Sequence, residues 1–352
     1  MLTQSVAIRE DVDVVTRPAG AKQLPKKALA IAVIVPCYNE SASIAKVVTD
    51  FRLALPTAKI YVYDNNSIDE TVARARAAGA IIRRETLQGK GNVVRRMFAD
   101  VDADVYVLAD GDDTYDAAVA PALIELLLTE GLDMVSGQRV ADVADTEAYR
   151  PGHQFGNRLL TAMVATIFGD RMHDMLSGYR VLSRRFVKSF PCLTRGFEIE
   201  TELTVHALEL GMPIGEVRTC YGHRPSGSTS KLHTVRDGIY ILVTIVQLIK
   251  NERPLWFFGG IFVVLALASV VLAIPIVETW RETGLVPRLP TAVLATGMVL
   301  LAFLSLTCGM ILDTVTIGRR EAKRMRYLSI PFLDSPATSG RLNLPPDGAA
   351  EA

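Results

Sequence analysis

The sequence predicts an α/β domain with a doubly wound sheet, followed by two membrane-spanning helices. Short apolar runs rich in β-branched residues alternate with helical segments between residues 28 and 136, a pattern typical of strands joined by crossover helices. Polar side chains follow successive runs, at the strand ends where such sheets bind ligands. Further along, the runs 255–277 and 291–312 carry no charge, and each is long enough to span a bilayer.

The composition is that of a protein in contact with a membrane. Hydrophobic residues make up 49% of the 352 residues, which is high for a purely soluble chain. The 38 basic and 38 acidic residues cancel, so the net charge gives no indication of a nucleic-acid partner. Four scattered cysteines show no CxxC or metal-finger spacing and are interpreted as reduced thiols: Cys37, Cys192, Cys220 and Cys308.

The expected elements follow one another closely. Residues 1–27 mix charges with proline and glycine and contain no continuous apolar segment, so we expect a disordered leader and no signal peptide. The first strand, 28–35, stops at Pro36. We then expect a helix over 41–53, a strand at 59–63, a helix over 70–78, a strand at 80–82, a helix over 92–101, a strand at 105–108, a helix over 118–129 and a strand at 133–136.

A cluster of carboxylates follows the strand at 105–108. Asp110, Asp112, Asp113 and Asp116 lie within seven residues of one another. Carboxylates this crowded raise each other's pKa unless a cation lies among them. Oxygen ligands of this kind suit Mg²⁺ or Mn²⁺. The alternative is a polar turn without a metal, because Asp and Gly are common turn residues.

Four motifs in a fixed order resemble those of glycosyltransferase family 2. They are VPCYNE at 35–40, DNNSIDET at 64–71, GKGN at 89–92 and DGD at 110–112. Their spacing is similar to that of the polyprenyl-phosphate sugar transferases, the branch with dolichyl-phosphate mannose synthase and bactoprenol glucosyltransferases. The resemblance covers residues 30–235 and implies a GT-A (Rossmann-like) nucleotide-sugar domain at 28–231. The GxGxxG fingerprint is missing from the first strand-to-helix turn, which disfavours a dehydrogenase.

The resemblance implies a donor site on the first half of this domain. The donor nucleoside would lie along the 36–40 turn, and Asp64 would accept a hydrogen bond from its base. Lys90 would neutralise the diphosphate, although a solvated loop lysine is the alternative. The residues implied in nucleotide-sugar binding are Pro36, Tyr38, Glu40, Asp64, Asn66, Lys90 and Asp110.

The same resemblance implies a divalent ion, Mg²⁺ or Mn²⁺, held by Asp110 and Asp112. Thr114 stands where the family usually has a glutamine as a further ligand. Asp113 or water could take the place of that ligand.

Cationic residues of the second half are candidates for an acceptor phosphate, because a guanidinium group suits phosphate oxygens. Arg139 ends a strand, Arg180 closes an Asp–Ser–Gly–aromatic–Arg loop, and the segment 221–231 resembles an Arg-x-x-Gly-x-Ser-Lys motif. Surface salt bridges and a flexible linker are the alternatives. The acceptor-phosphate candidates are Arg139, Arg180, Arg224, Ser228 and Lys231. Glu198 and Glu200 begin a helix, and we expect a structural role for both.

The rest of the chain predicts a membrane anchor. Residues 232–253 are amphipathic enough for an interfacial helix, and the region 254–313 contains the two spans. Basic residues flank the pair, which places the catalytic domain and both termini in the cytoplasm at an inner (plasma) membrane. The tail, 314–352, is expected to be basic and then disordered. Because every candidate site residue precedes residue 232, we expect the sheet domain to fold and bind nucleotide without the helices.

These features imply an inverting, metal-dependent transfer of a hexose from a UDP- or GDP-sugar to a polyprenyl monophosphate. The product would serve cell-envelope glycan or glycoprotein assembly, and the expected catalytic residues are Asp112, Arg139, Arg180 and Lys231. The alternatives are another membrane or polysaccharide acceptor, or an inactive membrane scaffold. A processive polysaccharide synthase is disfavoured, because neither Trp256 nor Trp280 follows an arginine as its motif requires. The sequence does not identify the sugar, the nucleotide or the oligomeric state, and a homo-oligomer stays open.

Overall fold

The structure is a computed structural model that describes residues 29–140, 172, 174–196, 198–220, 222, 246–247 and 250–332. The chain divides into two compact units. One consists of Met1–Thr234 together with Lys323–Ala352, and the other of Val235–Ala322. The expected leader, most of the expected interfacial helix and the last twenty residues lie outside the described part of the chain.

Seven strands among the described residues form one mixed sheet in the order β3-β2-β1-β4-β6-β5-β7. Neighbouring strands run parallel, except that β6 is antiparallel to both β4 and β5. The reversed strand, β6, follows the loop that contains Asp174, Ser177 and Gly178. We expected no strand at this place. The strands are β1 (Ile31–Cys37), β2 (Lys59–Asp64), β3 (Ile81–Arg84), β4 (Val105–Leu108), β5 (Met134–Val140), β6 (Arg180–Ser183) and β7 (Ile214–Cys220).

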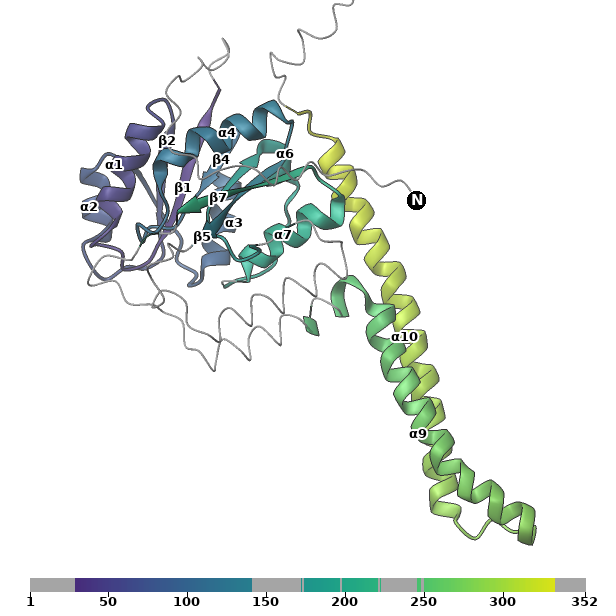
Figure 1. Cartoon of the computed structure of the whole chain (residues 1–352). Coiled ribbons are helices and arrows are strands. Elements are labelled where there is room, and N and C mark those ends of the chain that lie inside the picture. Colours follow the sequence, from purple (N-terminus) through teal and green to yellow (C-terminus); the bar gives the residue numbers. More distant parts are fainter. Residues whose placement is uncertain are drawn as a thin grey trace, which may run out of the picture. The chain divides into compact units, whose positions relative to one another are not determined.

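Helices lie on both faces of this sheet (Figure 1). They are α1 (Ile44–Ala54), α2 (Thr71–Ala77), α3 (Lys90–Asp100), α4 (Ala120–Thr129), α6 (Arg184–Ser189) and α7 (Ile199–Leu210), with a short 3₁₀ turn, η1 (Ala117–Val119). On one face, Val33 of β1 and Val107 of β4 belong to a buried cluster with residues of α1 and α4. On the other face, the ring of Phe98 in α3 meets Tyr106 of β4 edge-on, with 6.3 Å between centroids. The predicted α/β architecture is therefore confirmed.

The sequence pattern explains why α1 packs where it does. Its buried residues, Ile44, Val47, Val48 and Phe51, follow the spacing i, i+3, i+4 and i+7, which forms one apolar stripe on a helix. The strands β1 and β4 are buried almost throughout, as expected of central strands whose two faces are both covered. This packing fixes the carboxyl ends of the central strands.

Those strand ends bring the expected site residues to one edge of the sheet. Cys37 at the end of β1 pairs in register with Asp64 at the end of β2. On the other side of β1, Ile34 pairs with Leu108, the last residue of β4. The turn that carries Asp110 and Asp112 therefore begins beside the turn that follows β1.

The second unit contains one long helix and most of another, and the two lie side by side (Figure 1). They are α9 (Pro254–Thr283) and α10 (Leu289–Leu328), and both are long and apolar enough to cross a membrane. The hydroxyl of Ser269 donates to the carbonyl of Ala295 (2.9 Å) and that of Ser305 to the carbonyl of Phe258 (3.0 Å). Both helices extend beyond the expected spans, and α10 continues through the basic segment that we assigned to the tail.

Candidate active site

Asp112 is a buried member of the acid cluster, with 6% of its surface exposed. Its Oδ1 accepts hydrogen bonds from the hydroxyl of Thr114 (2.6 Å) and from the backbone N–H of Thr114 (3.4 Å). Thr114 therefore orients the Asp112 carboxylate. This is a supporting role for the position where the sequence led us to look for a further metal ligand.

Asp113, considered above as a replacement ligand, is directed toward α1. Its backbone has a positive φ of 61°, and its Oδ1 lies 2.7 Å from Nζ of Lys46. Hydrogen bonds to Asp113 and Asp50 raise the pKa of Lys46. A lysine of α1 thus neutralises Asp113, which makes it a poor candidate for the third metal ligand.

Lys90 lies in the acid cluster itself. Its Nζ is 2.5 Å from Oδ1 of Asp110 and 2.7 Å from Oε1 of Glu200, and only 8% of the lysine side chain is exposed. Burial alone would lower the pKa of Lys90, but the charges of Asp110 and Glu200 outweigh it and raise that pKa. A solvated loop lysine is therefore the wrong description of Lys90.

Glu200 is a site residue that the sequence analysis missed. We expected a structural role, because acidic residues at the start of a helix are favoured by the helix dipole in any protein. The structure directs its carboxylate at Lys90. The available signal was the spacing of Glu198, Glu200 and Glu202, because an acidic N-cap residue followed by two carboxylates in the first turn is more than the dipole needs.

The Gly-Lys-Gly turn at the start of α3 is closed by the loop 193–196. The N–H of Gly91 donates to the carbonyls of Arg195 (3.0 Å) and Gly196 (3.1 Å). A Cβ atom on Gly89 or Gly91 would collide with the carbonyls of this loop, and Gly89 has a φ of +128°. The two glycines therefore admit the loop, and the amide of Gly91 does not face a ligand.

Glu202 holds this loop in place. Its carboxylate accepts hydrogen bonds from the N–H groups of Leu193 (2.8 Å) and Thr194 (2.9 Å) and from the Thr194 hydroxyl (2.6 Å). Successive carboxylates of α7 thus serve two purposes. Glu200 contacts the lysine of α3, and Glu202 fixes the loop that covers the start of the same helix.

The expected donor turn after β2 is stabilised by its asparagines. Asp64 is 4% exposed, and its Oδ1 accepts from the N–H of Ser67 (3.1 Å). Asn65, which the sequence analysis did not single out, accepts from the N–H of Gly89 (2.8 Å) and so joins this turn to the glycine turn. Asn66 has a φ of +66° and donates to the carbonyl of Thr86 (2.9 Å).

The turn after β1 is tied to the acid cluster. The N–H of Glu40 donates to the hydroxyl of Thr71 (2.8 Å), and the hydroxyl of Ser43 donates to the carbonyl of Gly111 (2.6 Å). Pro36 pairs in register with Tyr63 of β2, and Tyr38 is 36% exposed. The four sequence motifs therefore meet at one sheet edge, joined by hydrogen bonds.

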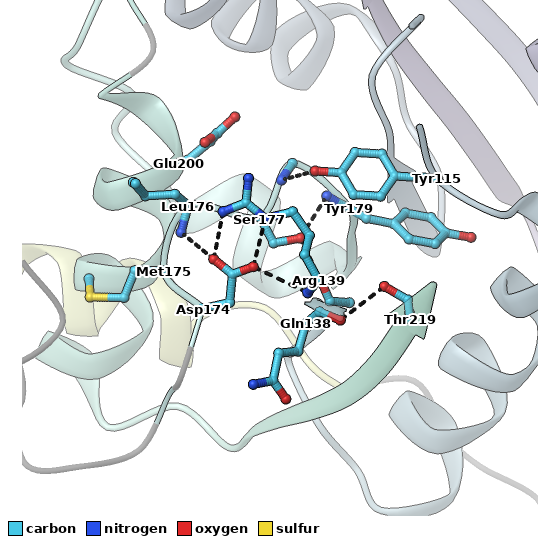
Figure 2. A network of polar contacts seen from close by, with 12 residues as sticks. Tyr115, Gln138, Arg139, Asp174, Met175, Leu176, Ser177, Tyr179, Glu200 and Thr219 are labelled. Atoms are coloured by element: carbon cyan, nitrogen blue, oxygen red, sulfur yellow. Dashed lines mark hydrogen bonds and ion pairs between the residues drawn. The ribbon is translucent and has the colours of Figure 1, made fainter. Parts of the chain in front are cut away.

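Arg139, at the end of β5, forms a two-pronged ion pair with Asp174. Its Nε and Nη2 each lie 2.8 Å from a carboxylate oxygen, and its backbone N–H donates to the same group (3.2 Å) (Figure 2). Burial would lower the pKa of Arg139, but Asp174 outweighs it and raises that pKa. Burial would raise the pKa of Asp174, and its bonds to Arg139 lower that pKa instead. The N–H of Asp174 donates to Glu216 (2.8 Å).

Arg180 has a different environment from the one we expected. It is fully buried, and its guanidinium donates to the carbonyls of Ser177 (3.0 Å), Met175 (2.8 Å) and Glu200 (2.9 Å). These bonds join the Asp–Ser–Gly loop to the start of α7. The geometry does not support a direct contact between Arg180 and an acceptor phosphate, and it fits a structural role.

Gly178 lets this loop approach the acid cluster. A Cβ atom there would lie 2.5 Å from Oδ2 of Asp110, so a larger residue would displace the carboxylate or the loop. The N–H of Gly178 donates to the hydroxyl of Tyr115 (2.9 Å). Burial, together with the charge of Asp110, raises the pKa of Tyr115.

The acid cluster offers a donor set that fits a hard divalent ion. Asp110 and Asp112 supply carboxylate oxygens on one turn, as Mg²⁺ and Mn²⁺ prefer. Within the described residues, no group of three His, Cys, Asp or Glu side chains is assembled around a common point. Lys90 and Lys46 supply part of the positive charge that these crowded carboxylates need. The acceptor candidates Arg224, Ser228 and Lys231 lie outside the described residues and stay predictions.

Comparison with known proteins identifies the family of this chain. The model named Glycosyl transferase family 2 matches residues 32–190. Glycosyltransferase AglJ of Haloferax volcanii is 32% identical over 306 residues, which cover 85% of this chain and 98% of that protein. The chain belongs to glycosyltransferase family 2. It is therefore an enzyme of the glycosyltransferase class, and the resemblance in its four motifs is confirmed at the level of the family.

A further relative and a solved structure are also similar to this chain. Dolichyl-phosphate hexose transferase of Haloferax volcanii is 30% identical over 224 residues, 63% of this chain and 95% of that protein. Glucosyl-3-phosphoglycerate synthase from Mycobacterium tuberculosis, solved with Mn²⁺, UDP and glucosyl-3-phosphoglycerate, superposes with a TM-score of 0.52. It is 24% identical, and the match covers 63% of this chain and 79% of that one. This likeness confirms the GT-A fold. The Mn²⁺ and UDP belong to that enzyme.

Proposed function

We propose that this enzyme transfers a hexose from a nucleoside diphosphate sugar to a polyprenyl monophosphate, with inversion at the anomeric carbon. The observation that carries the proposal is a juxtaposition at one sheet edge. A carboxylate pair with a buried lysine, suited to a donor diphosphate, meets the loop 174–179 at Gly178, and Arg139 forms an ion pair with Asp174 at the start of that loop. The chain also contains two helices that could cross a membrane, where a lipid acceptor is found.

On the donor side, Asp64 binds the nucleoside base and Lys90 neutralises the diphosphate. Asp110 and Asp112 hold Mg²⁺ or Mn²⁺, which would stabilise the negative charge of the departing nucleoside diphosphate. Lys90 already lies at this turn, 2.5 Å from Asp110, so it needs no large movement to reach a phosphate there. A UDP-hexose is our first choice of donor, and a GDP-hexose is the second.

On the acceptor side, the nucleophile is a phosphate oxygen that is already anionic at neutral pH. Such an acceptor needs little help from a general base, so alignment and charge stabilisation supply the rate enhancement. Arg139 is 19% exposed and is our candidate for the phosphate among the described residues. We assign Arg224, Ser228 and Lys231 to the same phosphate from their motif alone.

The membrane arrangement follows from the sequence of the two helices. We propose that α9 and α10 cross the bilayer and that the basic flanks stay in the cytoplasm with the catalytic domain. No Asp, Glu, Lys, Arg or His lies in the runs 255–277 and 291–312, which suits an anchor rather than a transport path. The acceptor head group would then lie close to the catalytic domain.

A donor panel tests this proposal. The purified full chain in lipid nanodiscs is given radiolabelled UDP-glucose, UDP-N-acetylglucosamine or GDP-mannose, with Mn²⁺ and undecaprenyl or dolichyl phosphate. We expect label to enter an acid-labile lipid with one donor, and EDTA to abolish the transfer. Label that enters only protein, polysaccharide or a lipid without phosphate would indicate the alternative acceptor. No transfer and no metal-dependent hydrolysis of any donor would contradict the proposal.

A further inference from the structure

The ammonium group of Lys90 is shared between carboxylates of two different elements. Asp110 follows β4 and Glu200 lies in the first turn of α7, and each carboxylate is within 2.7 Å of Nζ. The Glu200 side chain is 12% exposed and that of Asp110 is 26% exposed. Lys90 is therefore held both by a candidate metal ligand and by a residue of another element that no motif assigns.

The two carboxylates differ in what happens to them when a divalent cation binds. Lys90 and the cation compete for the same Asp110 carboxylate, and like charges at this distance repel strongly in a partly buried site. Lys90 must therefore loosen its contact with Asp110 when the cation arrives. Glu200 is a partner of Lys90 that does not belong to the Asp-Gly-Asp turn, so it can keep the ammonium.

The position of Glu200 is fixed by its own surroundings. Its backbone carbonyl accepts hydrogen bonds from the buried guanidinium of Arg180 (2.9 Å) and from the hydroxyl of Thr204 (3.2 Å). Two residues further on, Glu202 holds the loop 193–196 that covers the start of α3. The backbone of Glu200 is therefore anchored by residues that do not belong to the Asp110 turn.

We propose that Glu200 is a positioning residue that retains Lys90 in the donor site when a divalent cation takes over Asp110. Without Glu200, Lys90 would lose a charged partner at the moment of metal binding, and its amine would become more accessible. With Glu200, the ammonium stays within reach of the diphosphate. The inference rests on the metal site of the proposed function. It gives Glu200 a role in holding Lys90, beyond a favourable interaction with the helix dipole.

The rate at which the Lys90 amine is acylated reports whether Lys90 is retained in the site, and the measurement needs no turnover. The full chain in nanodiscs is treated with an amine-acylating reagent, and acylation of Lys90 is followed by mass spectrometry. The reaction is run with EDTA and then with Mn²⁺ plus UDP, and again with Mn²⁺ plus GDP. Binding of Mn²⁺ is measured in parallel by electron paramagnetic resonance. The variants are Glu200→Gln and, as a matched control, Glu198→Gln, since Glu198 is partly exposed in the same turn.

In the wild-type chain and in Glu198→Gln, we expect Lys90 to stay protected with and without Mn²⁺. In Glu200→Gln, we expect protection in EDTA and acylation about tenfold faster or more when Mn²⁺ binds, the effect of losing one charged partner. The thermal unfolding midpoint of Glu200→Gln, measured alongside, separates this from a general loss of structure, which would expose Lys90 in EDTA as well.

Three results would overturn the inference. Acylation of Lys90 in the wild-type chain when Mn²⁺ binds would show that Glu200 does not retain it. Unchanged protection in Glu200→Gln with Mn²⁺ bound would show that Glu200 is not needed, and both results would leave the proposed metal site intact. Failure of the wild-type chain to bind Mn²⁺ with either nucleotide would instead remove the metal site and, with it, this role of Glu200.

Discussion

The hydroxyl of Tyr327 donates a 2.7 Å hydrogen bond to Oδ2 of Asp133, a residue 194 positions earlier in the chain. Asp133 is completely buried and also accepts from Arg185 and Ser183. The guanidinium of Arg185 lies over the rings of both Tyr327 and Phe332, at 4.9 and 4.6 Å from their centroids. The last turns of α10 therefore belong to the unit that carries the candidate active site, here called the catalytic unit. The sequence had not indicated this.

A second contact joins the end of α10 to the catalytic unit. Nζ of Lys323 lies 2.6 Å from Oε2 of Glu209, a carboxylate whose side chain is only 2% exposed. We expect Lys323→Met to lower the free energy of unfolding by about 1–3 kcal/mol, because a buried carboxylate loses a charged partner. Denaturant unfolding of the full chain in micelles measures this. Arg324→Met is the matched control, since Arg324 is exposed, and an equal loss in both variants would contradict the role of Lys323.

The same contacts change what we expect of a truncated chain. The sequence analysis led us to expect that the sheet domain folds and binds nucleotide without the helices. A chain that ends at residue 251 lacks Lys323 and Tyr327, and so leaves Glu209 and Asp133 with fewer partners. We now expect such a chain to unfold at a lower temperature than a chain in which residues 323–332 are joined back by a flexible linker. Equal unfolding midpoints would contradict this.

The parts of the fold that could be predicted are those with a repeating pattern. The stripe of α1 follows from its helical period, and the strands around Val33 and Val107 follow from short apolar runs, rich in β-branched residues, that alternate with helical segments. The reversed strand β6 is as short as β4, with four residues in each. It pairs antiparallel with both neighbours, and an apolar run does not specify the direction in which its strand pairs. Site residues also differ in whether a sequence pattern identifies them. Lys90 stands in a motif, whereas Glu200 begins a helix, where an acidic residue has an ordinary explanation.

The environment of an arginine side chain is a second feature that the sequence does not predict. Residue type alone does not say whether a guanidinium faces a ligand or the carbonyl groups of its own chain, because both offer oxygen acceptors. Arg180 satisfies carbonyls of three residues and is fully buried. Arg139 keeps partial exposure beside Asp174. Only the packing of the loop before β6 distinguishes them.

Asp112→Asn tests the metal assignment. The amide oxygen can still accept the hydrogen bond from Thr114, so we expect the fold to survive. The lost charge should reduce metal-dependent turnover by about 100-fold or more, in line with the several kcal/mol that metal-ion charge stabilisation supplies. Asp116→Asn is the control, because Asp116 accepts from the N–H of Ala118 at the start of η1 (2.8 Å) and an asparagine can do the same. Wild-type turnover of Asp112→Asn, or full activity in EDTA, would refute the assignment.

Lys231→Ala and Arg180→Ala should separate acceptor binding from structure. We expect Lys231→Ala to weaken use of the lipid phosphate by roughly 10- to 150-fold, the effect of one charge-assisted contact, with an unchanged KM for the nucleotide-sugar. For Arg180→Ala we expect a loss of stability first, since its buried carbonyl partners are left without donors. Steady-state kinetics with both substrates varied, together with thermal unfolding, give the comparison. A stable Arg180→Ala variant with a selective acceptor defect would restore the role that the sequence suggested.

His206 should make the catalytic unit sensitive to mild acid. Its ring is 2% exposed and packs edge-on against Phe186 and Phe190, at 5.3 and 5.2 Å between centroids. Burial, with the charge of Lys323 nearby, lowers the pKa of His206 from 6.5 to about 3. The unfolded chain therefore binds a proton below pH 6.5 that the folded chain refuses until near pH 3. The stability that depends on neutral His206 is present above pH 6.5 and is lost as the pH falls toward 3.

His206→Leu removes this proton linkage and should flatten the pH dependence. Between pH 7 and pH 5 we expect the wild-type chain to lose about 2 kcal/mol more unfolding free energy than the variant does, from the shift of one histidine. The hydroxyl of Ser189, which pairs with the His206 ring, also donates to the carbonyl of Phe186 (3.0 Å) and so keeps a partner in the variant. Burial would raise the pKa of Asp69, but hydrogen bonds from Thr71 and Ser41 outweigh it and lower that pKa to about 2. The contribution of Asp69 to stability is therefore lost only at lower pH. Denaturant titrations at the two pH values measure the difference, and parallel losses in both proteins would show that His206 titrates alike in the folded and unfolded chains.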